Sequence, residues 1–269
     1  MPANDNHDVI RVLAVGDIVG KPGCRALFSL LKSVRKETRA DLVIVNGENA
    51  SDGSGLTPDL VNDIYKAGAD VITSGNHIWR KREIYPVLEK DDRMLRPDNY
   101  PVGVPGKGSC TVPVKDTKVS ILNLEGVLNR SRLRCPFLHA KEKLQKLKKE
   151  SPIVIIDFHA EFAAEKEALA VYLDGEISVL FGTHTHVQTA DERIFPKGTG
   201  YITDIGMTGP IGSVIGMNRD VAMRRACTQL PLKLEVAENK GMLMGVVFSI
   251  DMNNGRTVNI ERVQEYASV

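Results

Sequence analysis

The chain has 269 residues, of which 35 are Lys or Arg and 34 are Asp or Glu, so its formal net charge is +1. This length buries enough apolar surface to fold without disulfides, and the charge balance argues against global attraction to nucleic acid or membranes. Its apolar stretches are too short for a spanning helix, and its four cysteines form no CxxC pair. We therefore expect a cytoplasmic protein with free thiols and no membrane association.

The first third of the chain alternates short apolar runs with amphipathic patterns. Apolar, β-branched runs at residues 9–15, 42–45 and 70–73 predict buried strands, each of which ends at a polar loop. Between them, apolar residues at helical spacing predict helices over residues 22–37 and 57–67. This alternation indicates an α/β fold with right-handed crossover units and a largely parallel sheet.

The alternation continues after an irregular segment at residues 95–108. Further strands are predicted at residues 110–114, 119–124, 153–157 and 177–181, and further helices at residues 141–149 and 161–172. Residues 207–210 predict only a turn, and three alternating runs from Leu230 onward predict an antiparallel meander. Since no long linker interrupts the pattern, we expect a single domain over residues 9–269, preceded by a flexible tail at residues 1–8.

Side chains of the types that can bind metals follow five of the predicted strands. They are Asp17, Glu48, Asn49, Asn76, His77, His159, His184 and His186. In open α/β sheets, ligands bind beyond the carboxyl ends of the strands, so we expect these side chains to meet in one crevice. Imidazole together with carboxylate or amide oxygen suits manganese, iron or zinc. The set is larger than one tetrahedral ion needs, and two ions about 3.5–4 Å apart form the usual clamp for displacement at phosphorus.

Each of these features alone has an ordinary structural interpretation. Asp17 could form a turn or cap a helix, Glu48 could satisfy the backbone of its own loop, and His159 could be a buried core histidine. The pair His184 and His186 is harder to explain by packing, because two imidazoles flank one threonine at a strand end. Taken together, the five strand ends favour a metal site.

Three motifs resemble those of the calcineurin-like metallophosphoesterase superfamily. They are Gly16-Asp17, Gly75-Asn76-His77 and Gly182-Thr183-His184-Thr185-His186. Two positions depart from the superfamily pattern: Val19 stands where a ligand histidine is usual, and Glu48 stands where an aspartate is usual. With these departures, and with segments 157–161, 183–189 and 204–210, the chain resembles the YmdB-like bacterial phosphodiesterases.

The resemblance implies a four-layer α-β-β-α sandwich with mixed sheets and two divalent or trivalent transition-metal ions per chain. Glu48 would bridge the two ions; Asp17, Asn49 and His186 would complete the first, and Asn76, His159 and His184 the second. Iron is the first expectation, with manganese or zinc as alternatives, because Asn49 supplies an oxygen where relatives use imidazole. His77 would remain unligated, placed to stabilise phosphoryl oxygens or to protonate the leaving oxygen.

The resemblance also implies an activity. The enzyme would hydrolyse 2′,3′-cyclic nucleotides, with 3′,5′-cyclic nucleotides or similar small phosphodiesters as further substrates, by attack of metal-activated hydroxide. The alternative is a metal-stabilised regulatory or RNA-associated protein that binds a phosphoester with little turnover. The charge gives no support to RNA association, and a homo-oligomer is implied by the family alone.

Three other features favour ordinary interpretations. Residues 16–22 differ from a P-loop, because three residues separate the glycines and a proline follows the lysine. Trp79 is expected to pack behind the site, with nucleobase stacking as the alternative. His7 and His139 match no motif, and we expect both on the surface.

Overall fold

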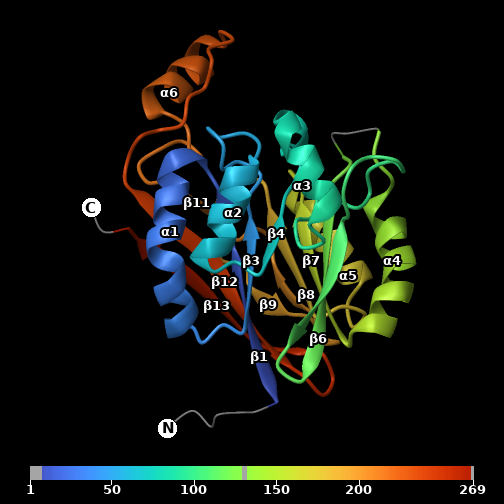
Figure 1. The fold of residues 1–269 in the computed structure, drawn as a ribbon. Helices are drawn as coiled ribbons and strands as arrows, with labels where there is room; N and C mark the ends of the chain where they lie inside the picture. Colours follow the sequence, from blue (N-terminus) through green and yellow to red (C-terminus); the bar gives the residue numbers. More distant parts are fainter. Residues whose placement is uncertain (1–7, 129–131, 268–269) are drawn as a thin grey trace.

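Two mixed β-sheets form the centre of the computed structural model, which describes residues 8–128 and 132–267 (Figure 1). The first sheet has the order β2-β11-β12-β1-β3-β4, with β13 paired to β12. Its strands are β1 (Val9–Val15), β2 (Asp17–Ile18), β3 (Leu42–Asn46), β4 (Val71–Thr73), β11 (Met207–Pro210), β12 (Gly241–Asp251) and β13 (Thr257–Tyr266). The second has the order β5-β6-β7-β8-β10-β9. Its strands are β5 (Ser109–Val114), β6 (Thr117–Glu125), β7 (Ile153–His159), β8 (Val179–Thr183), β9 (Arg193–Ile194) and β10 (Gly200–Ile202).

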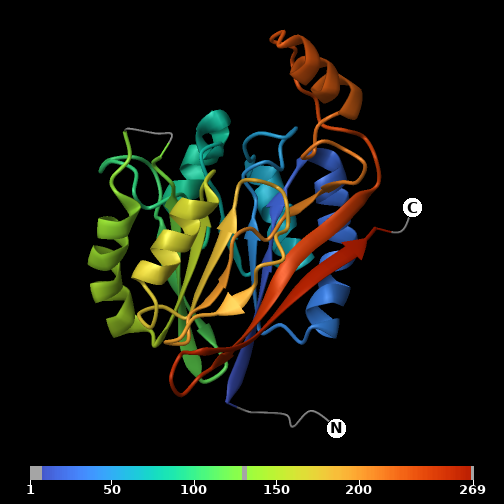
Figure 2. The same ribbon diagram turned by 180° about the vertical axis from the view of Figure 1, so that it is seen from behind.

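Helices cover the outer faces of the two sheets (Figures 1 and 2). Helices α1 (Gly20–Glu37) and α2 (Pro58–Ala67) are the crossovers between the parallel strands β1, β3 and β4. Helices α4 (Pro136–Glu150) and α5 (Ala163–Tyr172) pack on the second sheet. The remaining helical segments are Ile78–Arg80, Arg82–Ile84, α3 (Tyr85–Lys90) and α6 (Arg219–Thr228).

The side chains of β1 explain the layers. Val12 and Ala14 belong to the core between the two sheets, whereas Leu13 and Val15 belong to the core under α1 and α2. This division follows from the strand itself, because successive side chains point to opposite faces. A third core lies between the second sheet and helices α4 and α5. The structure therefore confirms the four-layer α-β-β-α sandwich.

Several predicted elements differ from the structure. Strands β7 and β8 extend beyond their predicted ends, so that His159 and Thr183 lie within strands. The first run of the predicted meander is wrong, since residues 230–238 contribute only an isolated bridge at Val236, although β12 and β13 pair antiparallel as predicted. Residues 207–210 form β11 rather than a turn. Helix α6 was not predicted, because it buries no side chain and therefore has no apolar face.

His139 is a further correction, because it is buried rather than exposed. It lies on α4 with 5% of its surface accessible, and its Nε2 is 2.5 Å from Oδ2 of Asp98. His7 lies outside the described residues. The Trp79 ring packs edge-on against those of Tyr85 and Tyr100, as the packing interpretation expects. Among the described residues, no helix combines the length and apolar character needed to cross a bilayer.

Candidate metal centre

The predicted metal-binding side chains come from both sheets and meet at one edge of the sandwich. Asp17 follows β1, Glu48 and Asn49 follow β3, Asn76 follows β4, His159 ends β7, and His184 and His186 follow β8. Parallel pairing of β3 with β4, and of β7 with β8, places the carboxyl ends of these strands side by side. The expected convergence is therefore present in the fold.

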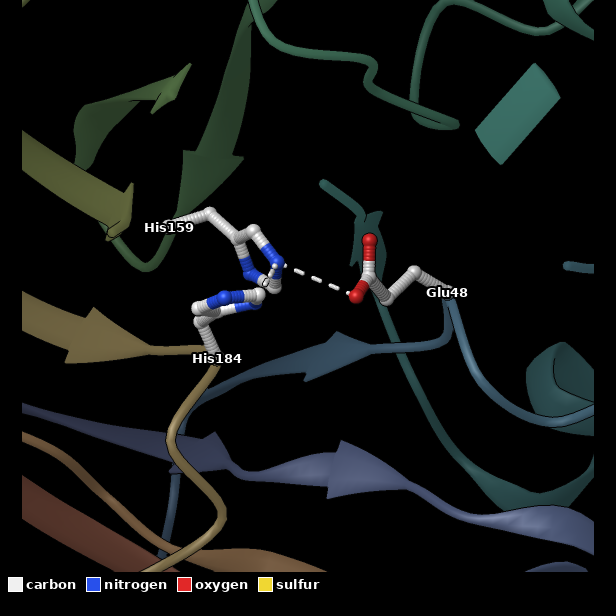
Figure 3. Close-up of side chains that lie close together, drawn as sticks. All are labelled: Glu48, His159 and His184. Atoms are coloured by element: carbon white, nitrogen blue, oxygen red, sulfur yellow. Dashed lines mark hydrogen bonds and ion pairs between the residues drawn. The ribbon is translucent and has the colours of Figure 1, made fainter. Parts of the chain in front are cut away.

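Glu48, His159 and His184 form the centre of this cluster (Figure 3). Nε2 of His159 lies 3.0 Å from Oε1 of Glu48 and 3.0 Å from Nδ1 of His184. Oδ1 of Asn76 lies 3.2 Å from the same His159 nitrogen. One candidate ligand atom from each of the three central residues lies within 4.8 Å of the other two, close enough to surround one ion.

Hydrogen bonds on the outer side of the two imidazoles determine where their protons lie. Nδ1 of His159 is 2.9 Å from the hydroxyl of Thr183, and that hydroxyl donates to Asp157 at 2.7 Å, so the imidazole is the donor. Nε2 of His184 is 3.0 Å from a carboxylate oxygen of Glu161, to which it donates. The inner nitrogens, Nε2 of His159 and Nδ1 of His184, therefore carry lone pairs.

Four hydrogen-bond acceptors thus face one another without a shared proton: the two inner nitrogens, Oε1 of Glu48 and Oδ1 of Asn76. Burial lowers the pKa of His159 to about 3. Burial, together with the neighbouring His159, lowers the pKa of His184 to about 4. Both imidazoles are therefore neutral at pH 7. Acceptors that face one another repel, most strongly where they are buried as on Glu48 and His159, and a cation between them removes that repulsion.

Asp17, Asn49 and His186 form the other half of the cluster. Nδ1 of His186 donates to the carbonyl oxygen of Ile215 at 2.9 Å, so its Nε2 lone pair faces Oδ1 of Asp17, 3.9 Å away. That Oδ1 is buried and accepts no hydrogen bond from any described residue. Burial raises the pKa of Asp17. A cation would satisfy the buried Asp17 oxygen, so the residues present fit a metal ion here as well.

Asn49 and His77 differ in part from the expected arrangement. Oδ1 of Asn49 accepts from Nδ1 of His77 at 2.7 Å, and Nδ2 of Asn49 lies 3.2 Å from Nε2 of His186. The amide nitrogen, rather than the expected ligand oxygen, is therefore next to His186. His77 also donates its backbone N–H to Glu48 at 3.1 Å, and its side chain is 27% exposed, so it lies on the solvent side of the cluster.

The backbone around the cluster is unusual. His184 and His186 have φ angles of 97° and 65°, a region that few residues other than glycine adopt. Gly75 packs so closely that a Cβ there would lie 2.1 Å from Cδ2 of His159. Strained conformations of this kind persist only where the surroundings hold them, and they concentrate at functional sites.

A small cavity of about 60 Å³ opens beside the cluster, with Asn76, His159, Glu161 and Phe162 among its lining residues. A larger cavity of about 690 Å³ lies elsewhere, between β5 and α4. We assign the candidate site by its ligand chemistry rather than by cavity size, because the larger cavity is lined by opposite charges that pair with each other, such as Lys143 with Asp98.

A family model described as YmdB-like protein matches residues 13–263. This chain belongs to the YmdB-like family. It is 44% identical to a Bacillus subtilis protein named 2′,3′-cyclic-nucleotide 2′-phosphodiesterase, over 94% of this chain and 96% of that one. The crystal structure of a hypothetical protein from Thermus thermophilus matches with a TM-score of 0.90 and 37% identity, over 96% of this chain and 100% of the other.

A more distant match shows the fold alone. The structure of the Haemophilus influenzae NAD nucleotidase has a TM-score of 0.61 at 12% identity, covering 96% of this chain and 56% of that one. The YmdB-like assignment confirms the family resemblance, and this match agrees with the predicted sandwich. The names of the relatives support an enzyme of the phosphodiesterase class. The family suggests divalent metal ions, and the cluster is a candidate site for them.

The residues that orient the imidazoles were not predicted from the sequence. Thr183 and the Ile215 carbonyl hold His159 and His186, while Glu161 holds His184. Glu161 lies within a segment that carried the family resemblance, which was the available signal. A backbone carbonyl such as that of Ile215 leaves no trace in the residue types.

Proposed function

We propose that this protein is a dinuclear metal-dependent phosphodiesterase that hydrolyses cyclic nucleotides. The supporting observation is the convergence of four acceptors at His159, His184, Glu48 and Asn76, next to the buried Asp17 oxygen that accepts no hydrogen bond from the described residues. The name of the Bacillus subtilis relative supports 2′,3′-cyclic nucleotides as first substrates. We propose 3′,5′-cyclic nucleotides as further substrates.

The ligand set divides between two ions. Glu48 would bridge them; Asp17, Asn49 and His186 would hold one, and Asn76, His159 and His184 the other. The mixture of imidazole and oxygen ligands favours iron, with manganese or zinc as alternatives. When bound, the ions neutralise the phosphodiester charge and lower the pKa of a water molecule to near neutrality.

His77 is the proposed proton donor to the leaving oxygen. Its ring is oriented by Asn49, which accepts from Nδ1, and its partial exposure leaves it in reach of a substrate. The same position lets the imidazole donate a hydrogen bond to a phosphoryl oxygen as negative charge develops there.

The test is metal-dependent hydrolysis of 2′,3′-cyclic AMP and 3′,5′-cyclic AMP by the purified protein. We expect a chelator to abolish turnover and added iron or manganese to restore it. His184→Ala should lose activity by at least about 10²-fold, because it removes one of the lone pairs that would hold an ion. His139→Gln is the matched control, since it changes a buried histidine on α4. Turnover that survives the chelator would contradict the proposal.

A second variant separates catalysis from binding. We expect His77→Ala to keep its metal content and to lose about 10²-fold or more in kcat, the usual effect of removing a general acid. If the wild-type protein binds metal yet hydrolyses neither nucleotide, the metal-stabilised regulatory or RNA-associated alternative gains support. If His77→Ala retains full activity, only the proton-donor assignment is wrong.

A further inference from the structure

Lys166 is a fully buried lysine behind the candidate metal centre. It lies on α5, its exposed fraction is 0%, and its Nζ donates to Oδ2 of Asp204 and to the carbonyl oxygen of Thr183, both at 2.8 Å. Lysine is among the residue types least often fully buried. The site leaves room for its stem because position 182 is glycine: a Cβ there would lie 2.7 Å from Cδ of Lys166.

Asp204 connects this lysine to the loop that carries two candidate ligands. Its Oδ2 also accepts from the backbone N–H of Thr185 at 3.1 Å and from the Thr185 hydroxyl at 2.8 Å. Its Oδ1 accepts from the backbone N–H of Gly206 at 2.9 Å. The buried pair therefore holds the residue before His184 and the residue after it.

The loop needs such support because its backbone is strained. His184 and His186 both have positive φ angles, and non-glycine residues keep that conformation only where neighbouring contacts fix it. A buried ion pair is in general a weak source of net stability compared with apolar packing. The hydrogen bonds of the Lys166–Asp204 pair to Thr183 and Thr185 instead suit it to fixing the conformation of the loop backbone.

We propose that Lys166 and Asp204 are positioning residues that fix the backbone of residues 183–185, so that His184 Nδ1 and His186 Nε2 face the metal site. The proposal rests on the proposed function, in which these two imidazoles hold ions. Hydrogen bonds from the pair reach the loop at Thr183 and Thr185, and Gly206 anchors Asp204, so the pair acts on the ligands through the backbone.

The test compares metal binding with loop structure in the full chain. Lys166→Met removes the charge and keeps the length of the stem, and Thr185→Ala removes one hydrogen bond to Asp204 and is the milder change. Asp98→Asn is the control, because Asp98 is also a buried carboxylate, paired with Lys143 and His139 of α4. The probe is Co²⁺, whose affinity and visible absorption both report on coordination.

We expect Lys166→Met to weaken Co²⁺ binding at least tenfold and to change the absorption spectrum, Thr185→Ala to weaken it less, and Asp98→Asn to stay within about twofold of wild type. Wild-type affinity and spectrum in both Lys166→Met and Thr185→Ala would overturn the proposal. Should Lys166→Met fail to fold, Thr185→Ala decides the outcome alone.

Hydrogen exchange of the metal-free protein separates this proposal from the proposed function. The backbone N–H of Thr185 donates to Asp204, so we expect this amide to be protected from exchange in the wild type. In Thr185→Ala and Lys166→Met, we expect its protection factor to fall at least tenfold. If the wild type binds no Co²⁺, the proposed function fails, while lost protection still supports the positioning role. Unchanged protection at Thr185 would overturn the positioning role itself.

Discussion

The imidazole of His159 shows how single residues place a candidate ligand. Its Nδ1 donates to Thr183, its Cδ2 edge packs against Gly75, and its ring meets that of His184 edge-on with centroids 4.6 Å apart. The ring therefore has no room to rotate, and its Nε2 stays directed at Glu48. The residue type was predictable from the sequence, but this orientation depends on contacts with three other strand ends.

Substitution of Gly75 should remove this orientation. In Gly75→Ala the new Cβ would come within 2.1 Å of His159, which cannot move away without losing its bond to Thr183. We expect phosphodiesterase activity and metal content both to fall at least tenfold. Gly47→Ala is the matched control, because the atom nearest to its Cβ would be Cγ2 of Ile72 at 3.1 Å, well beyond the 2.1 Å at Gly75. Full metal content in Gly75→Ala would contradict this, because it would show that the His159 ring can move aside and still hold an ion.

Asp157 gives a prediction on pH. Its carboxyl is buried and accepts from Thr73, Thr183 and Asn46, and burial raises its pKa from the ordinary 3.8 to about 7. Between these values the folded protein keeps a proton that the unfolded chain has lost. The contribution of Asp157 to stability is therefore complete below about pH 4 and declines as the pH rises towards 7.

The measurement is the free energy of unfolding of the metal-free protein in urea, for wild type and Asp157→Asn. The free energy of unfolding of the wild type minus that of Asp157→Asn should fall with rising pH. Between the two pKa values of Asp157, its limiting slope is about 1.4 kcal/mol per pH unit. Other titrating groups are common to both proteins and cancel. A difference that is constant from about pH 4.5 to about pH 6.5 would contradict the raised pKa.

At the level of elements, the strand ends were predictable and the peripheral segments were not. Strands β1, β3, β4, β7 and β8 are short, buried and apolar, so their existence follows from composition and periodicity. Strand β11 and helix α6 carry no such signal. Pairing with β12 and β2 makes β11 a strand, and α6 extends away from the body of the molecule (Figure 1).

Helix α6 should contribute little to the stability of the whole fold, because none of its residues is buried. Ala226→Pro would break this helix, and we expect the free energy of unfolding to change by less than about 1 kcal/mol. Ala168→Pro in α5 is the matched control, also an exposed alanine, but in a helix that buries Leu169 and Ala170. It should cost about 3 kcal/mol or more. Equal losses would show that α6 packs against something in solution.

At the level of the whole molecule, the sandwich brings together residues that lie far apart in the chain. Asp17 and Glu48 come from the first sheet, and His159, His184 and His186 from the second. Local patterns predicted the strands that these residues follow and their polar ends, and the resemblance to a known family predicted that two sheets stack. The contacts that orient these residues, such as the carbonyl of Ile215 on His186, arise only from the tertiary fold.

In the proposed arrangement, the seven candidate ligands hold two ions per chain. The most direct measurement is the metal-to-protein ratio of the purified wild-type protein, determined by elemental analysis after loading with iron or manganese. We expect a ratio of about two, falling to one or less in His184→Ala. A wild-type ratio below one, or a ratio unchanged by removal of His184, would contradict it.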